Sequence, residues 1–235
     1  GDPNVMINTT KEQAWHSLAD GKKPKWIEVA FSFWVIASKD RTFLVDTGFR
    51  NRNMVKQWDI QHYREPRVAL KESGIDLDRI TDVIITHGHW DHIGGIYQFP
   101  SSRIWIHRAV FGKLEGPGPL RQFLRNIHNA GNLALTRGIQ NIAPGIAVVE
   151  TGLHYPGFQY VVVKNPDGIR VLVSDIAPLW ANFTTQHPTG QTSDPERTLQ
   201  VQAVIWRLAG ERLDRNDLGE GPHGVEGDEG LPEGQ

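Results

Sequence analysis

Short hydrophobic runs separated by turn residues recur along the 235-residue chain and predict strands alternating with a few helices. Runs that are rich in β-branched and aromatic residues and end at Gly, Pro, Asn or Asp are typical of strands. Helices are expected at 66–73, ending at Gly74, and at 194–213, where Asp194 is a good N-cap and Pro195 suits the first turn. The expected strands are 26–38, 41–48, 80–86, 103–107, 147–152, 158–165 and 169–175.

The polar and glycine-rich stretches divide the chain into a main domain and two flanking segments. Residues 1–25 form a polar, variable N-terminal segment, in which a short helix at 11–18 is a further hypothesis. Residues 26–213 form the main domain. Within it, a Gly- and Pro-containing stretch followed by a helical pattern at 120–135 indicates a helical insert, 108–140, between two strand-rich halves. Residues 214–235 are a tail rich in glycine, proline and acids, which buries too little surface to order itself alone.

Composition and charge exclude several classes of protein and of site. The chain is 39% hydrophobic and 22% charged with a net charge of −2, which is ordinary for a globular domain and gives no sign of a nucleic-acid or membrane partner. There are no cysteines, so any metal must be held by histidine and carboxylate. No hydrophobic run is long enough to span a bilayer. Residues 1–10 do not have the pattern of a signal peptide, so we expect a cytoplasmic protein. The alternative is an exported protein whose signal peptide has been removed.

The strongest chemical signal is the run His87-Gly88-His89-Trp90-Asp91-His92, directly after the expected strand at 80–86. His87 and His89 are two residues apart, so in extended chain their side chains point the same way. Gly88 permits a sharp bend. A single histidine is usually an ordinary polar residue, but four nitrogen and oxygen ligands within six residues predict a site for Zn²⁺, Fe²⁺ or Mn²⁺.

This run resembles the HxHxDH signature of the metallo-β-lactamase superfamily, and three further motifs follow the family's order. They are FLVDTG with Asp46, TGLHYPG with His154, and VLVSD with Asp175. The segment 174–200 also resembles the N-acyl homoserine lactonase branch. The resemblance covers about residues 30–213. It implies an α/β (α+β) fold, a four-layer αββα sandwich with the metal site at one sheet edge, roofed by the insert 108–140.

The resemblance also implies two divalent metal ions, with zinc expected and iron or manganese open. One ion would be held by His87, His89 and His154, and Asp175 would bridge both. The second would be held by Asp91, His92 and a late histidine, for which only His223 remains. Asp46 would lie behind the ligands and orient one of the histidines. Two such ions can share an activated hydroxide, and Asp91 would pass a proton to the leaving oxygen.

We therefore expect a metal-dependent hydrolase of a small-molecule ester, most simply a lactonase that opens acyl-homoserine lactones in quorum quenching. A phosphodiester or thioester hydrolase of the same fold is an alternative. A non-catalytic metal-binding member with an incomplete second metal site is another, since no hydrophobic strand precedes His223. The lactonase branch often has tyrosine three residues after the bridging aspartate. Pro178 stands there, with Tyr155 and Trp180 as substitutes. The oligomeric state is open, a homodimer included.

Overall fold

The computed structural model describes residues 5–9, 28–114 and 118–210. The hypothetical helix at 11–18 and the tail at 214–235, with His223, lie outside the described residues. Within the described ranges, no helix is long and apolar enough to cross a membrane.

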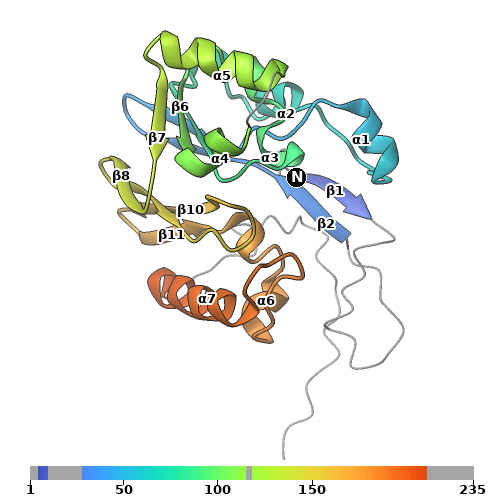
Figure 1. Ribbon diagram of the computed structural model, residues 1–235, viewed down its shortest axis with the longest axis vertical. Helices are drawn as coiled ribbons and strands as arrows, with labels where there is room; N and C mark the ends of the chain where they lie inside the picture. The colour runs from blue at the N-terminus through green and yellow to red at the C-terminus, as the bar shows by residue number, and fades with distance from the viewer. Residues whose placement is uncertain (1–4, 10–27, 115–117, 211–235) are drawn as a thin grey trace, which may run out of the picture.

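The first sheet has five strands in the order β3-β4-β5-β6-β7. β3 and β4 are antiparallel, and the other pairs are parallel, so a crossover segment connects each of those strands to the next. These crossovers contain the helices of the N-terminal half (Figure 1). The strand bounds are β3 Trp34–Ala37, β4 Thr42–Val45, β5 Asp82–Ile85, β6 Arg103–His107 and β7 Leu133–Thr136.

The second sheet is antiparallel, with the order β11-β10-β9-β8, and its strands follow one another along the chain. A separate two-stranded sheet pairs β1 with β2. The bounds are β8 Ile139–Ala143, β9 Ile146–Glu150, β10 Gln159–Asn165 and β11 Gly168–Leu172, with β1 Val5–Thr9 and β2 Glu28–Ser32.

Helices cover the outer face of each sheet (Figure 1). α2, α4 and α5 lie on the first sheet, and α6 and α7 lie on the second. The α-helices are α1 Arg52–Gln57, α2 Pro66–Glu72, α3 Trp90–Ile93, α4 Arg108–Lys113, α5 Pro119–Asn129, α6 Trp180–Thr184 and α7 Pro195–Ala209. Short 3₁₀ turns occur at Leu77–Arg79, Ile96–Gln98 and Ser174–Ile176.

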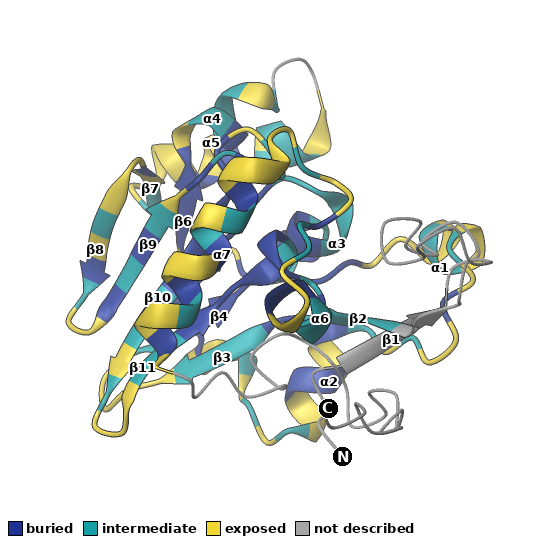
Figure 2. Ribbon diagram, turned by 90° about the horizontal axis from the view of Figure 1, so that it is seen from below, coloured by how far each residue is buried: buried dark blue, intermediate teal, exposed yellow. Residues whose placement is uncertain are grey.

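Three hydrophobic clusters lie between these layers, and the alternation of side chains along the strands separates them. Leu44 of β4 packs under the helices of the first sheet, whereas its neighbours Phe43 and Val45 face the second sheet. On the second sheet, Val161 faces inward, and Tyr160 packs toward α6 and α7. Buried residues follow the strands of both sheets (Figure 2). Three interfaces between four layers confirm the predicted αββα sandwich.

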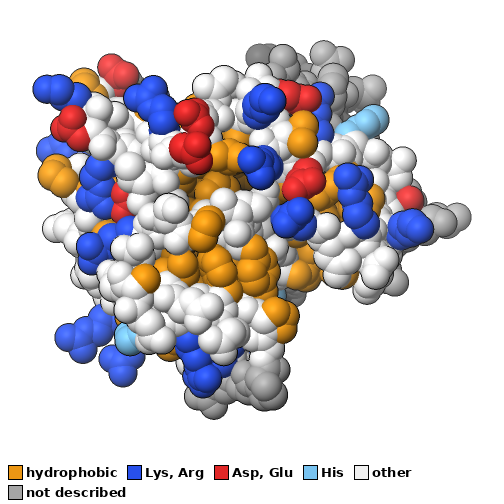
Figure 3. All heavy atoms as spheres, turned by 90° about the horizontal axis from the view of Figure 1, so that it is seen from above, with side chains coloured by type: hydrophobic (Ala, Val, Ile, Leu, Met, Phe, Trp, Pro, Cys, Tyr) orange, Lys and Arg blue, Asp and Glu red, His pale blue; other side chains and the backbone are white. Residues whose placement is uncertain are grey.

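The face seen in Figure 3 has charged side chains of both signs around a central group of hydrophobic ones. Lys and Arg are the more numerous charged side chains on this face, and Asp and Glu lie among them.

The structure corrects the predicted pattern inside 108–140. Residues 133–135, included in the predicted helix, belong to β7, which pairs with β6, so part of this segment belongs to the first sheet. The helix ends at Asn129 because Gly131 adopts φ +77° and the Asn132 N–H donates to the Ile127 carbonyl, which closes the last turn.

Boundaries differ from the prediction elsewhere too, most clearly at the first strand of the domain and at the last helix. The single strand expected at 26–38 is split at buried Phe33 into β2 and β3, which belong to different sheets. The last helix begins as predicted, with the Asp194 side chain accepting from the Arg197 N–H, but it ends at Ala209 rather than 213. Gly210 has φ +61° there, a left-handed conformation that terminates helices.

Candidate metal centre

The motif residues lie where β5 ends and α3 begins. His87 and His89 follow β5, and His89 is the N-cap of α3, which contains Asp91 and His92. His154 lies on the connection between β9 and β10, and Asp175 lies in the 3₁₀ turn after β11. The site is therefore built from both sheets, at the carboxyl ends of β5 and β11.

Three histidine nitrogens converge beside one oxygen of Asp175. His89 Nδ1 lies 2.9 Å from His87 Nε2 and 3.0 Å from His154 Nε2. Asp175 Oδ2 lies 3.2 Å from His154 Nε2 and 3.6 Å from His87 Nε2. These four residues each offer one donor atom, and the four atoms all lie within 4.8 Å of one another. We call this set the three-histidine group.

The other oxygen of Asp175 faces a second set of donors. Asp175 Oδ1 lies 3.3 Å from His92 Nε2, and Asp91 Oδ2 lies 3.4 Å from the same nitrogen. Asp91, His92 and Asp175 therefore form a second group, with donor atoms again within 4.8 Å of one another. Asp175 is shared, with one oxygen toward each group. This is the arrangement that a carboxylate bridging two cations requires.

Hydrogen bonds behind the donors fix which nitrogen of each ring faces the centre. His92 Nδ1 lies 2.7 Å from Asp46 Oδ2, and an ionised carboxylate only accepts, so this nitrogen donates and Nε2 faces the centre. Thr86 Oγ1 donates to Asp46 Oδ2 at 2.8 Å and so accepts from His87 Nδ1 at 3.0 Å. His154 Nδ1 donates to the Gln191 carbonyl at 2.8 Å. The Nε2 atoms of His87, His92 and His154 consequently face the centre.

Asp46 is fully buried in this network. It also accepts from the Thr86 N–H at 2.8 Å, so its carboxylate serves three donors. Burial raises the pKa of Asp46, and the bonds from His92 and Thr86 oppose that shift. Its φ of +61° is uncommon for a residue with a side chain and marks a backbone held by its surroundings.

The electrostatics suit a cation at the centre. Burial lowers the pKa of His87 well below its usual value, and it lowers that of His89 as well, which keeps both rings neutral and able to donate a lone pair. Burial acts against ionisation of Asp175, but His92 and bonds from His154 and His92 outweigh it and hold the pKa of Asp175 well below its usual range. Burial also lowers the pKa of His92, but the carboxylates of Asp175, Asp91 and Asp46 outweigh burial and raise that pKa well above its usual value, so this ring must give up a proton to bind a metal. Imidazoles beside an ionised carboxylate fit Zn²⁺, Fe²⁺ or Mn²⁺.

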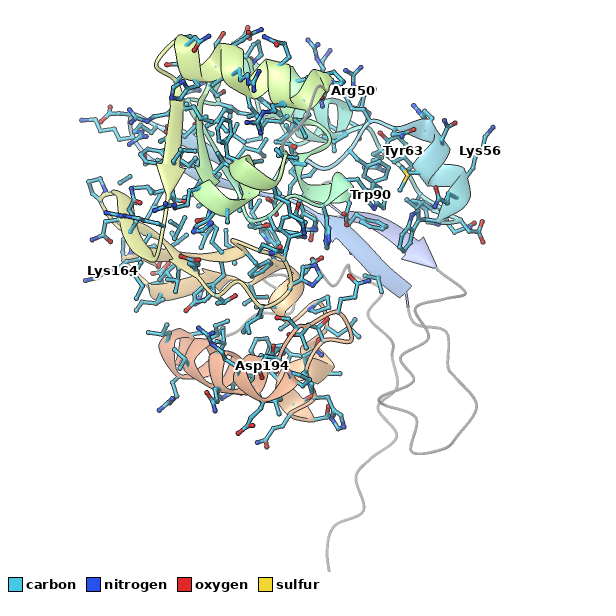
Figure 4. The ribbon with its side chains drawn as sticks, viewed as in Figure 1. Arg50, Lys56, Tyr63, Trp90, Lys164 and Asp194 are labelled. Atoms are coloured by element: carbon cyan, nitrogen blue, oxygen red, sulfur yellow. The ribbon has the colours of Figure 1, made fainter. Side chains whose placement is uncertain are left out.

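Trp90, in the middle of the motif, is directed away from the donors. Its ring packs against Phe49 at 4.6 Å and against Phe31 at 5.6 Å between centroids. Trp90 and Tyr63 lie in the region between α3 and α1 (Figure 4), and Tyr63 also stacks on Phe49. This aromatic cluster supports the start of α3, which contains Asp91 and His92.

The structure brings together six of the seven predicted ligands and places Asp46 behind them. His223 lies outside the described residues, so among those described the second group has three donors. Of the two suggested substitutes for the missing tyrosine, Tyr155 contacts His89, whereas Trp180 packs with Phe183 and Trp206 near α7. The predicted roof reaches the site through Lys113 of α4, whose Nζ lies 4.5 Å from the centre of the Tyr155 ring.

Sequence reasoning missed Thr86 and Gln191. Thr86 stands directly before His87 at the end of a buried strand, so its hydroxyl next to the motif was a usable signal. Gln191 contributes its backbone carbonyl, which any residue has, and no sequence pattern would have identified it.

The fold and the two groups of potential metal ligands are those of a metal-dependent hydrolase. Residues 31–227 match the model of the metallo-beta-lactamase superfamily, and the chain belongs to that superfamily. An N-acyl homoserine lactonase of Bacillus cereus is 24% identical over 170 residues, which is 66% of this chain and 67% of that protein. This relative belongs to the N-acyl homoserine lactonase branch, which is the branch that the segment 174–200 resembles.

Two solved structures illustrate the likeness of the fold. One is an N-acyl homoserine lactone hydrolase with the product N-hexanoyl-L-homoserine bound at its catalytic metal center. It has a TM-score of 0.66 at 18% identity and covers 88% of this chain and 89% of its own. The other is a dizinc quorum-quenching lactonase, AidC, with a TM-score of 0.60 at 16% identity. The match covers 81% of this chain and 72% of that one. Similarity at this level shows the fold and leaves the reaction to be argued from the site.

Proposed function

We propose that this protein is a metal-dependent hydrolase that opens the ester ring of acyl-homoserine lactones. The observation that supports this most directly is Asp175, with one oxygen toward the three-histidine group and the other toward Asp91 and His92. The lactonase relatives supply the substrate class. Removal of such signal molecules, or quorum quenching, would be the biological result.

The residues present fit two divalent ions, for which zinc is our first choice. His87, His89 and His154 would hold one, Asp91 and His92 the other, and Asp175 both; His223 remains the predicted further ligand of the second. Two ions held in this way polarise an ester carbonyl and make water nucleophilic near neutral pH. The chain's own contribution is to fix the donor atoms through Asp46, Thr86 and the Gln191 carbonyl.

Asp91 is the candidate for proton transfer to the leaving oxygen. Its side chain is 14% exposed, and its Oδ2 faces His92, while no described residue bonds its Oδ1. An oxygen with no protein partner at the edge of the site can hold a proton and deliver it to the ring oxygen as the ester opens. This role requires no residue beyond those already at the centre.

The test compares substrates on one metal-loaded preparation. Purified protein supplied with zinc, iron or manganese is assayed with N-hexanoyl-homoserine lactone, a phosphodiester and a thioester, and its metal content is measured. We expect two ions per chain, lactone opening, and loss of turnover in His89→Ala. His128→Ala, on the exposed side of α5, is the matched control and should keep both properties.

Two results would contradict the proposal. Two bound ions with turnover of only the phosphodiester or the thioester would assign a different substrate class to this fold. Fewer than one ion per chain and no turnover would make the protein a non-catalytic member of its superfamily.

A further inference from the structure

One histidine of the centre lacks the support that the other three have. His87, His92 and His154 each use Nε2 toward the centre and bond through Nδ1 to Thr86, Asp46 and the Gln191 carbonyl, respectively. His89 is turned the other way, with Nδ1 toward the centre. Within residues 28–114 and 118–210, no group bonds its Nε2. A hydrogen bond therefore does not set the orientation of this ring in the part of the chain described.

The ring of Tyr155 packs against the His89 imidazole. It lies 4.9 Å from the His89 ring between centroids, at an interplanar angle of 84°, and 5.8 Å from the His87 ring. A perpendicular contact at this distance is one of the two favoured geometries for aromatic pairs. It also obstructs rotation of the imidazole about its Cβ–Cγ bond.

Gly88 is the residue that lets Tyr155 come so close. A Cβ at position 88 would lie 2.8 Å from the Tyr155 hydroxyl oxygen and 2.9 Å from the ring carbon that bears it. The backbone of Gly88 is not in the left-handed region, so conformation does not require glycine there. Close approach of the tyrosine is the physical reason that a side chain is excluded between the two histidines.

Tyr155 is itself held from two directions. Its carbonyl accepts from the Phe158 N–H at 2.8 Å, which fixes the turn between β9 and β10. Lys113 of α4 lies with Nζ 4.5 Å from the ring centre, a cation–π contact from another part of the chain. A ring fixed at both backbone and side chain can restrain its neighbour.

We infer that Tyr155 is a positioning residue for His89, restraining that imidazole by ring packing in place of a hydrogen bond. This inference rests on the metal centre proposed above. It assigns the effect to the aromatic ring and not to the hydroxyl. Gly88 contributes because the absence of a side chain leaves room for the Tyr155 ring.

The test is titration of metal-free protein with Co²⁺ alone, followed by visible absorption, which reports both affinity and ligand geometry. Tyr155→Phe keeps the ring and should bind Co²⁺ within twofold of wild type with an unchanged spectrum. Tyr155→Ala should weaken one of the two binding steps by roughly tenfold and change its spectrum. Tyr97→Ala removes a more exposed tyrosine that packs against Phe123, away from the centre, and should have no effect.

Gly88→Ala gives a second route to the same question without removing the tyrosine. The added methyl group displaces the Tyr155 ring, so the variant should show the same weakened step. In a Tyr155→Ala background, Gly88→Ala should add little further loss, because the atoms that it would meet are gone. This non-additivity distinguishes the contact from a general effect on folding.

The outcomes separate this inference from the proposed function. If wild-type protein binds no Co²⁺, the metal centre itself is refuted. If wild type binds two ions and Tyr155→Ala matches it in affinity and spectrum, the positioning role alone is refuted. Equal losses in Tyr155→Phe and Tyr155→Ala would also overturn the inference, since they would assign the effect to the hydroxyl. If Tyr155→Ala does not fold, wild-type behaviour of Gly88→Ala is the refuting result.

Discussion

Replacing Asp46 by asparagine should disable the second donor group with little change in shape. Asparagine also tolerates the positive φ at this position, so the substitution adds no backbone strain. The single amide oxygen of asparagine can still accept from the Thr86 N–H, but the amide NH₂ then faces His92 Nδ1. In the wild type, that nitrogen donates to Asp46 at 2.7 Å. Two donors repel, and the relief is for His92 to move its proton to Nε2. That nitrogen is the one that should bind the metal.

The expected losses follow from these contacts. Loss of a partner behind a ligand histidine lowers metal affinity by about 10- to 100-fold, or about 1.4–2.7 kcal/mol. Replacing a charge-assisted bond in a fully buried network should also lower the free energy of unfolding by about 2–3 kcal/mol. Isothermal titration of metal-free protein measures the first quantity, and urea unfolding measures the second.

Asp82→Asn is the matched control for Asp46→Asn. Asp82 is another buried aspartate, at the opposite end of β5, and it accepts from Trp105 Nε1 at 2.8 Å and from the Arg41 guanidinium. This variant should lose stability to a similar extent and keep the metal affinity of wild type. The reasoning is refuted if Asp46→Asn binds both ions as tightly as wild type, or if Asp82→Asn loses affinity to the same degree.

Three further predictions concern stability and are measured by urea unfolding. Glu150 accepts from the Gly138 N–H and faces His107, which lower its pKa, so Glu150→Gln should cost about 0.5–1 kcal/mol near pH 7, given a partly exposed side chain. These contacts stabilise only the ionised carboxylate, so the difference in unfolding free energy between wild type and Glu150→Gln should vanish as the pH falls through the pKa of Glu150, which lies below the ordinary 4.5. A difference that stays constant with pH would contradict this prediction. Gly95→Ala places a Cβ 2.1 Å from the Thr47 carbonyl oxygen and should cost about 1–3 kcal/mol, so unchanged stability would refute the contact. Asp194→Ala removes the cap of α7 and should cost about 0.5–2 kcal/mol, whereas Asp194→Asn should restore most of it.

Local hydrophobic patterns predicted most of the strands and helices, whereas the four layers and the candidate ligands outside the His motif were implied by the resemblance to the metallo-β-lactamase superfamily. β6 was predicted at its observed bounds, since its hydrophobic run ends abruptly on each side. β8 was not predicted, because Gln140 and Asn141 interrupt its hydrophobic pattern and pairing with β9 is what makes it a strand. β7 continues a helical pattern in sequence, and only the turn at Gly131 separates the two.

For the site, the limit lay in contacts between segments distant in sequence. The motif itself indicated His87, His89, Asp91 and His92 as candidate ligands, and the family resemblance added His154 and Asp175; the structure places all six together. No pattern could show that one oxygen of Asp175 faces each donor group, because that depends on how the two sheets pack. The contact of Tyr155 with Gly88 is of the same kind.

The two sheets meet at the end of β5, where Gln159 of β10 donates from its backbone N–H to the Thr86 carbonyl and from its side chain to the Ile85 carbonyl. The exposed connection at Arg137 and Gly138 joins the halves covalently. Cutting the chain there would leave His87, His89, Asp91 and His92 on one fragment and His154 and Asp175 on the other. Neither fragment alone would contain a complete donor group. Mixed together, they should reassociate more tightly when zinc is present, so that reassembly of the split protein becomes a direct reporter of metal availability.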